Sequence, residues 1–526
     1  MRVTALGHAG LEVTLKKASL LVDPWLSPEG AFQASWFQYP ENAHLARPET
    51  FQATAVVISH EHLDHVDTWT LSQIPSRIPV VIPRYPSPAL RRKVLAGGHR
   101  EVIEAAPWDP VEVAENTLVF FVPEESPMNH DAAIVIQGDG YTLLDMNDAR
   151  LSPMQLRMIR TTVGGRIHLF ALQTAGASWY PMCYEYPPER RKELASRKRL
   201  AKLGYAARAV RVVDPIVALP FAGPPCFLDP ELFPHNAEMD EGIFPDQLQS
   251  AAWLGKRGFP NVIVLLPGDT WDIETQIKET SPESVAFSVP DRWPYLEAYA
   301  SRRQDQIRCV LARYPEPADS LWIPFQTYFN RILSMSEYFN QKINMRVEFA
   351  IEGPGGGRWA VDFRPGKEGV YQEPGSCQYG YHFASRWLAA ILDGRTPWED
   401  FFLTLRFRAW REPDVYNDHL LGLLKFAHAA AFEAVERFEI GMTFVDRITV
   451  HAEGQTYHIQ RHCPHARNDL LDTGEVLPGR IIRCLAHHYE FSLDTGKCVN
   501  GNCGPLFTER IDSDVREQPH HRAEPS

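Results

Sequence analysis

The sequence is poor in cysteine, in long apolar runs and in net positive charge. Eight cysteines among 526 residues are too few for a disulfide scaffold. No apolar run reaches the ~18 residues of a membrane-spanning helix, and no signal-peptide pattern opens the chain. The formal net charge of -13 argues against a general nucleic-acid or anionic-membrane binder, because such proteins need a basic face. We therefore expect a cytoplasmic protein that binds neither nucleic acid nor membrane.

The length and the order of apolar segments predict several domains of α/β plus all-β class. A chain of 526 residues is longer than a single hydrophobic core supports. Short apolar segments separated by helical patterns predict buried strands at 11–15, 19–22 and 55–58. We predict an α/β domain at 1–275, an α+β middle region at 276–440, an all-β domain at 441–514 and a disordered tail at 515–526.

Two local patterns add detail to this division. Apolar residues alternate on both sides of a glycine-rich segment at 353–357, which predicts a hairpin. The segment lacks the Lys-Ser/Thr of a phosphate-binding loop. Residues 187–203 are rich in Arg and Lys and predict a helix that ends at Gly204. Its basic face is either simply solvated or the contact surface of an anionic ligand.

Half of the cysteines lie after residue 460, and two of them belong to a paired Cys–His pattern. The segment Cys463-Pro-His465 is followed, after 18 residues, by Cys484-Leu-Ala-His487. Rieske [2Fe-2S] centres bind one iron through two thiolates and the other through two imidazoles, which is the ligand set that this pattern supplies. A Cys2His2 zinc site has the same ligand types, but the short Cys-x-His half and the lack of a following recognition helix favour the cluster. The spacing selects His487 over the neighbouring His488.

A second metal-binding pattern follows the apolar segment that ends at Ser59. The string HEHLDH at 60–65 places imidazoles and a carboxylate at the end of a buried strand, and such ligands suit Zn, Fe or Mn. The string resembles the first motif of the metallo-β-lactamase fold, in which His8 and Asp23 fit the preceding strands. This resemblance implies an N-terminal αββα sandwich.

Further ligands in that fold come from strand ends that are far apart in the sequence. The predicted metal ligands are His60, His62, Asp64, His65, His130, Asp148 and His235, with Asp145 as a competitor of Asp148. Asp64 and His65 are also the predicted catalytic residues.

Several longer motifs are present, namely GHAGLEVTL at 7–15, LLVDPWL at 20–26, VVISHEHLDHVD at 56–67, AGASWYPM at 175–182, PFAG at 220–223 and WEDFFLTLRFRAWREPDVYN at 398–417. Together they resemble the CMP-N-acetylneuraminic acid hydroxylase family, which combines a Rieske domain with a metallo-β-lactamase-like domain. That family carries its Rieske domain at the N-terminus, whereas the pattern here is C-terminal. The resemblance covers most of the chain. It does not indicate that this protein has the same substrate as that family.

The resemblance implies an oxidoreductase, namely an oxygenase in which the Rieske cluster feeds single electrons to an iron site that activates dioxygen. Ligand chemistry agrees, because Zn²⁺ has no redox chemistry and an electron carrier beside a zinc hydrolase would have nothing to reduce. We expect one or two non-haem irons in the N-terminal site, with zinc as the alternative. The competing hypothesis is a zinc-dependent hydrolase whose Rieske domain senses redox state or docks a partner.

The expected partners follow from this hypothesis. A ferredoxin or flavin reductase would supply electrons, and the substrate would be a small molecule. An anionic or nucleotide-linked compound is one candidate, because Trp179, Tyr180 and the basic residues at 190–202 could contact it. The middle region resembles sterol-carrier-like domains that accompany other proteins of the metallo-β-lactamase fold. A homo-oligomer is left open.

Overall fold

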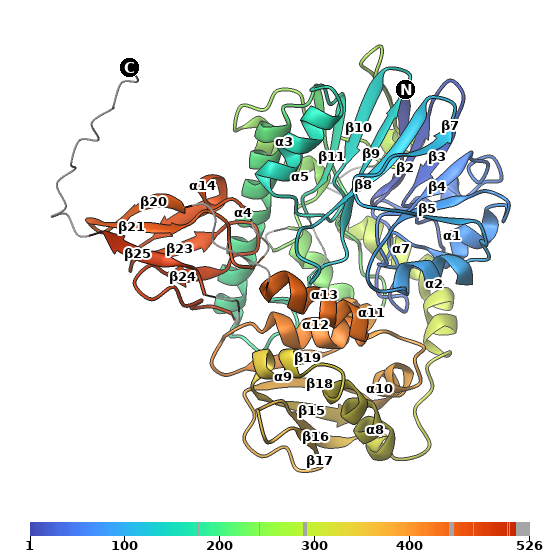
Figure 1. Ribbon diagram of the computed structural model, residues 1–526. Coiled ribbons are helices and arrows are strands. Elements are labelled where there is room, and N and C mark those ends of the chain that lie inside the picture. Colours follow the sequence, from blue (N-terminus) through green and yellow to red (C-terminus); the bar gives the residue numbers. More distant parts are fainter. Residues whose placement is uncertain are drawn as a thin grey trace, which may run out of the picture.

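The computed structural model describes most of the chain and places its three parts side by side (Figure 1). The N-terminal part is a sandwich of two sheets, the middle region lies against one end of it, and the small C-terminal β-domain lies beside the long helix α4 (Pro188–Val213). The tail predicted at 515–526 is outside the described residues. These are 1–175, 178–240, 242–287, 292–440, 447–465, 468–501, 503 and 505–511.

The two sheets of the N-terminal part face each other. Leu11 and Val57 from the first sheet and Phe121 and Leu143 from the second are fully buried in one shared core. The first sheet has the strand order β14 (Ile277–Glu279), β13 (Thr270–Asp272), β1 (Arg2–Gly7), β2 (Gly10–Thr14), β3 (Ser19–Val22), β4 (Ala55–Val57), β5 (Val80–Pro83) and β6 (Val102–Ala105). The second has the order β12 (Val217–Phe221), β11 (Leu169–Gln173), β10 (Tyr141–Asp145), β9 (Ala132–Gly138), β8 (Thr117–Pro123) and β7 (Val111–Ala114).

Helices cover the outer faces of both sheets. Leu71 and Val94 pack on the first sheet, and Ile159 and Val210 pack on the second. The layers are therefore α, β, β and α, which confirms the predicted sandwich. The helices of this part are α1 (Thr68–Gln73), α2 (Ala89–Ala96), α3 (Pro153–Thr162), α4 and α5 (Gln247–Gly255), with short 3₁₀ turns η1 (Ala43–Leu45) and η2 (Phe233–Met239).

Helix α4 is longer than the sequence pattern predicts. It does not end at Gly204 but continues to Val213. The second half buries Tyr205, Ala206 and Val210 against the second sheet. This apolar contact outweighs the cost of a glycine inside a helix, which is about 1 kcal/mol.

The middle region combines a mixed sheet with helices on its surface. The predicted glycine-rich hairpin is present, because β15 (Arg346–Glu352) pairs antiparallel with β16 (Gly357–Asp362) and Phe349 lies opposite Trp359. The strand order is β17 (Gly369–Tyr371), β16 (Gly357–Asp362), β15 (Arg346–Glu352), β18 (Tyr379–Ala384) and β19 (Arg408–Arg411). The helices are α6 (Pro282–Ala286), α7 (Arg292–Leu311), α8 (Trp322–Leu333), α9 (Glu337–Ile343), α10 (Ser385–Leu392), α11 (Trp398–Leu403), α12 (Asp418–Phe426) and α13 (Ala429–Ile440).

The middle region is joined to the sandwich by a continuous aromatic core. Trp25 and Phe37 from the first domain and Phe329 and Trp398 from the middle region are fully buried in it. Helices α11, α12 and α13 lie between the sandwich and the mixed sheet (Figure 1). This packing brings side chains of the middle region to the edge of the sandwich, where the predicted metal ligands lie. The similarity to sterol-carrier-like domains stays a prediction.

The C-terminal part is a small β-domain with its own core, which includes Tyr457, Ile459, Ile482 and Phe491. One sheet has the order β20 (Arg447–Ala452), β21 (Gln455–Gln460) and β25 (Thr508–Ile511), and the other has β22 (Gly474–Leu477), β23 (Ile481–Cys484) and β24 (Glu490–Ser492). The short helix α14 (Leu470–Thr473) precedes β22. We propose domain boundaries close to the predicted ones, with the first moved beyond 275 because β14 completes the first sheet at Glu279.

Candidate metal centres

The predicted N-terminal ligands lie in loops at one edge of the sandwich. The HEHLDH string follows β4, and His8 follows β1. Strands β9 and β10 are antiparallel, so the residue before β9, Asp131, lies near the loop after β10, which holds Asp148. Among the described residues, three groups place their ligand atoms within 4.8 Å of one another. They are His8, Asp64 and His65; His60, His65 and Asp148; and His60, His62 and Asp131.

His65 is held in the orientation that a metal ligand needs. Its Nδ1 lies 2.8 Å from Asp23 Oδ2, and the Ser59 hydroxyl donates to the same oxygen. Its Nε2 is buried, has no hydrogen-bond partner among the described residues and lies 3.4 Å from Asp148 Oδ1. A carboxylate on one imidazole nitrogen with the other nitrogen left open is the usual second contact of a metal-bound histidine.

Asp64 lies between two imidazoles. Its Oδ2 is 2.8 Å from His8 Nε2 and 3.8 Å from His65 Nε2. Burial alone would raise the pKa of Asp64, but the two imidazoles, His65 first, hold it below its ordinary value. Asp64 is therefore a carboxylate in the folded protein and can serve as an anionic ligand.

His60 and His62 present nitrogens to each other. His60 Nε2 lies 2.8 Å from His62 Nδ1, while His60 Nδ1 contacts the Ser59 hydroxyl at 2.8 Å. Burial, followed by the charge of His65, lowers the pKa of His60, so the imidazole is neutral as metal binding requires. On the far side, His62 Nε2 lies 3.1 Å from Glu399 Oε1. Because Glu399 contacts Nε2, the other nitrogen of His62, Nδ1, faces the candidate metal site.

Glu399 belongs to α11 of the middle region and is paired with Lys425 Nζ at 2.8 Å. We expect Glu399→Gln to lower the affinity of the N-terminal site for its metal by about 10-fold, the smaller end of what such outer contacts contribute. The glutamine side chain has no negative charge, so it no longer orients His62 through an ion pair and no longer neutralises Lys425. Metal titration of the apo-protein measures the effect. Glu352→Gln, an exposed carboxylate of the same region, is the control, and equal affinities in all three proteins would contradict the expectation.

Three predicted or competing ligands are not brought into these groups. His130 is stacked on Tyr85 and its Nδ1 lies 3.2 Å from Glu61. His235 lies on η2 and packs edge-on against Phe227. Asp145 is fully buried, and burial followed by the charge of Asp23 raises its pKa well above the usual range. We therefore leave His130, His235 and Asp145 out of the proposed ligand set.

Two members of the groups were not among the predicted ligands. Asp131 directly follows the predicted His130, and its Oδ1 lies 3.7 Å from His60 Nε2. The sequence feature that could have indicated Asp131 is the strand that begins at Ala132, because ligands in such folds lie at strand ends. His8 was noted only as fitting the fold, and its contact with Asp64 makes it a ligand candidate.

The four predicted cluster ligands converge in the C-terminal domain. Cys463 and Cys484 are buried free cysteines, and the rings of His465 and His487 are 4.6 Å apart. A hydrogen bond with Cys463 lowers the pKa of the Cys484 thiol to about 6. Both His465 Nδ1 and His487 Nδ1 are buried without a hydrogen-bond partner among the described residues. Two thiols and two open imidazole nitrogens fit a Rieske [2Fe-2S] cluster.

The middle region also contacts this cluster site. Asp418, the first residue of α12, has its Oδ2 3.0 Å from His465 Nε2 and accepts a hydrogen bond from the Tyr489 hydroxyl. Burial would lower the pKa of His465, but the charge of Asp418 raises it. Asp418 thus orients His465 as Asp23 orients His65.

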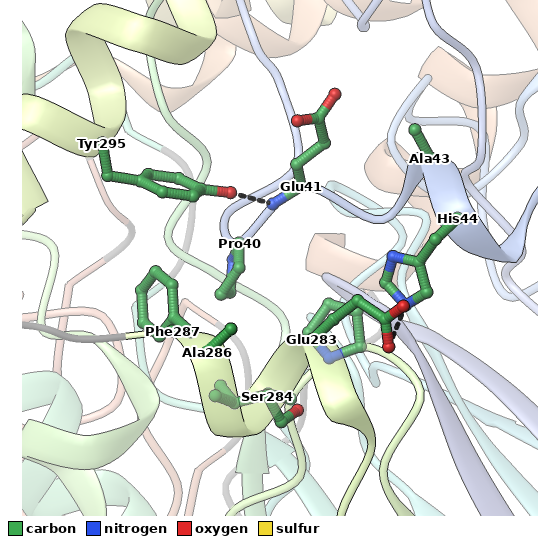
Figure 2. A pocket seen from close by; sticks show the side chains of 11 residues that line it. Pro40, Glu41, Ala43, His44, Glu283, Ser284, Ala286, Phe287 and Tyr295 are labelled. Carbon is green, nitrogen blue, oxygen red and sulfur yellow. Dashed lines mark hydrogen bonds and ion pairs between the residues drawn. The ribbon is translucent and has the colours of Figure 1, made fainter.

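Figure 2 shows a separate pocket. Its lining includes Pro40, His44, Glu283 and Tyr295. The Glu41 backbone N–H donates to the Tyr295 hydroxyl at 2.8 Å. None of the predicted metal ligands lines this pocket.

Comparisons with known proteins agree with this division. A beta-lactamase superfamily domain model matches residues 19–144, and a Rieske [2Fe-2S] domain model matches 427–508. A protein of Mycobacterium tuberculosis that is named as a Rieske 2Fe-2S iron-sulfur protein is 30% identical over 533 residues, covering 97% of this chain and 100% of its own. The chain belongs to this family of Rieske iron–sulfur proteins. A similarly named protein of Mycolicibacterium smegmatis is 29% identical over 97% of the chain.

More distant relatives confirm the resemblance stated from the sequence motifs. Cytidine monophosphate-N-acetylneuraminic acid hydroxylase of Mus musculus is 24% identical and covers 79% of this chain and 72% of its own length. Among solved structures, the diiron β-hydroxylase CmlA of Streptomyces venezuelae covers 53% of this chain and 54% of its own, with 16% identity and a TM-score of 0.35. We draw nothing further from a likeness at that TM-score. Within the described part of the chain, no helix is both long and apolar enough to cross a membrane.

Proposed function

We propose that the protein is a Rieske-type non-haem iron oxygenase that hydroxylates a small molecule. The observation that carries this proposal is the contact between the two sites. Arg150, two residues after Asp148, donates a hydrogen bond of 2.7 Å to the carbonyl of Ala486 in the cluster loop. A Rieske cluster carries one electron at a time, so a metal beside it can receive that electron only if the metal can change its oxidation state. Zinc cannot do this, whereas iron can.

The three groups suit two neighbouring metal positions. His60, His62 and Asp131 would hold one ion, and His8, Asp64 and His65 would hold the other. Asp148 is near both, because it shares a group with His60 and His65. When bound, iron supplies redox chemistry and dioxygen activation. The residues of this chain set the ligand charges and hold the imidazoles through Asp23 and Glu399.

The proposed partners are a ferredoxin or flavin reductase as the electron donor and a small-molecule substrate. A half-buried basic side chain supports an anionic substrate. Lys198 donates to the Tyr180 carbonyl and lies over the Tyr180 ring. Burial, followed by the charges of Arg150 and Arg411, lowers the pKa of Lys198 to about 7. An anion bound here would favour its charged form.

Anaerobic metal and sulfide analysis tests the proposed function. The purified protein should contain acid-labile sulfide and show a Rieske EPR signal after dithionite reduction. A Cys463→Ser variant that also carries Cys484→Ser should lose both but keep the iron of the N-terminal site. If that variant instead contains stoichiometric zinc and no iron, the oxygenase proposal fails and a zinc hydrolase with a Rieske sensing or docking domain takes its place.

A further inference from the structure

The cluster ligand His487 faces a carboxylate of the N-terminal domain. Its Nε2 lies 4.0 Å from Glu124 Oε2, and the Glu124 side chain is only 2% exposed. Neither nitrogen of His487 has a hydrogen-bond partner among the described residues. If Nδ1 binds the cluster, Nε2 points toward the neighbouring domain, where Glu124 lies opposite it.

Glu124 is fixed in place by contacts on both carboxylate oxygens. Its Oε1 accepts a hydrogen bond of 2.7 Å from the Arg150 backbone N–H, and its Oε2 accepts one of 3.1 Å from the Asn129 amide. The Arg150 guanidinium in turn donates to the Ala486 carbonyl, one residue before His487. Glu124 and the cluster loop are therefore held by the same arginine.

The backbone of Glu124 leads directly to the N-terminal site. Its N–H donates to the Asp131 carbonyl at 2.9 Å, one step beyond the last paired residues of β8 and β9. The Asp131 carboxylate belongs to the group that contains His60 and His62. One hydrogen bond thus joins the residue that faces the cluster ligand to a residue of the metal group.

We infer that electrons pass between the two metal centres within one chain, through Glu124 and Asp131. This inference rests on the proposed function. With both groups bound, one electron would leave the reduced cluster held by the C-terminal ligands and would reduce a ferric ion held by the N-terminal ligands. A one-electron donor of the ferredoxin class, or dithionite in the test, then restores the reduced cluster. Glu124 is a positioning residue, because it acts through His487 and Asp131.

Rapid-freeze EPR under anaerobic conditions tests the role of Glu124. The cluster is reduced while the N-terminal iron is ferric, and the decay of the reduced-cluster signal is followed. Glu124→Ala should slow this decay by about 10-fold or more, as loss of a well-placed outer contact does. Glu124→Gln keeps one acceptor oxygen, and therefore one of these two contacts, and should slow the decay less. Glu115→Gln, an exposed surface carboxylate, should decay at the wild-type rate.

Paired variants test transfer within one chain. One copy lacks the cluster through Cys463→Ser and Cys484→Ser, and the other lacks the N-terminal ligands His60 and His62 through alanine substitutions. Co-expression with two affinity tags selects assemblies that contain one copy of each. Transfer within one chain predicts that these assemblies show no electron exchange, or that the copies do not associate at all.

The possible outcomes separate the inference from the proposed function. Electron exchange in the mixed assemblies, or wild-type decay in Glu124→Ala protein with full iron and sulfide content, overturns the inference and leaves the oxygenase proposal standing. Wild-type protein in which the reduced cluster never reduces the N-terminal iron overturns both. Slow decay in Glu124→Ala with silent mixed assemblies supports transfer through Glu124.

Discussion

Replacing His465 with Ala should abolish the Rieske EPR signal and lower oxygen-dependent turnover by at least about 100-fold, because a cluster ligand is lost. His465 offers Nδ1 to the cluster site while Asp418 holds its Nε2. The N-terminal site is built from a different domain, so its iron should remain. Metal and sulfide analysis, together with reductant-driven oxygen uptake, measures both parts of the expectation.

The control for this variant is His451→Ala. His451 is an exposed histidine on β20 of the same domain, so its loss should leave the EPR signal and oxygen uptake unchanged. Unchanged oxygen uptake in the His465→Ala protein would show that the cluster does not supply the electrons. Loss of the N-terminal iron in that variant would instead show that the two sites do not fold independently.

The ligand candidates that the sequence brings together lie within short loops. Cys463 and His465 are separated by one residue, and His60 and His62 likewise, so local spacing alone brings each pair together. The αββα sandwich was predicted for a similar reason, because one short motif after a buried strand is characteristic of that fold. The C-terminal cluster domain is confirmed by the family comparison.

The residues that sequence reasoning did not find are brought in by tertiary packing. Asp131 reaches His60 because the two sheets pack face to face and bring the start of β9 close to the loop after β4. Glu399 and Asp418 come from helices of the middle region. No spacing in the sequence links α11 to the HEHLDH loop. His235 was chosen by residue type, and the structure places it on η2 beside Phe227, outside the three groups.

The middle region is therefore part of both sites. Its α11 supplies Glu399 to His62, and the first residue of α12, Asp418, contacts His465. Lys93 of α2 further joins the regions, because it donates to the Glu61 carbonyl and pairs with Asp400 at 2.9 Å. These contacts give a structural role to the WEDFF segment that the hydroxylase resemblance singled out.

His60→Ala should lower the affinity of the N-terminal site for metal by at least about 100-fold, since it removes a ligand and not merely an outer contact. His60 belongs to two of the three groups, and its imidazole is buried and neutral. The Rieske EPR signal should persist, because the cluster ligands all lie in the C-terminal domain. Metal content after dialysis against a chelator measures the loss.

His235→Ala is the matched control, because His235 was predicted from sequence as a ligand but lies outside the three groups. Its removal should leave the metal content unchanged. If His235→Ala lost the metal while His60→Ala kept it, the ligand set would have to be sought around η2. If both variants kept their full metal content, the ions would be held without His60, and the group of His60, His62 and Asp131 would not be a metal position.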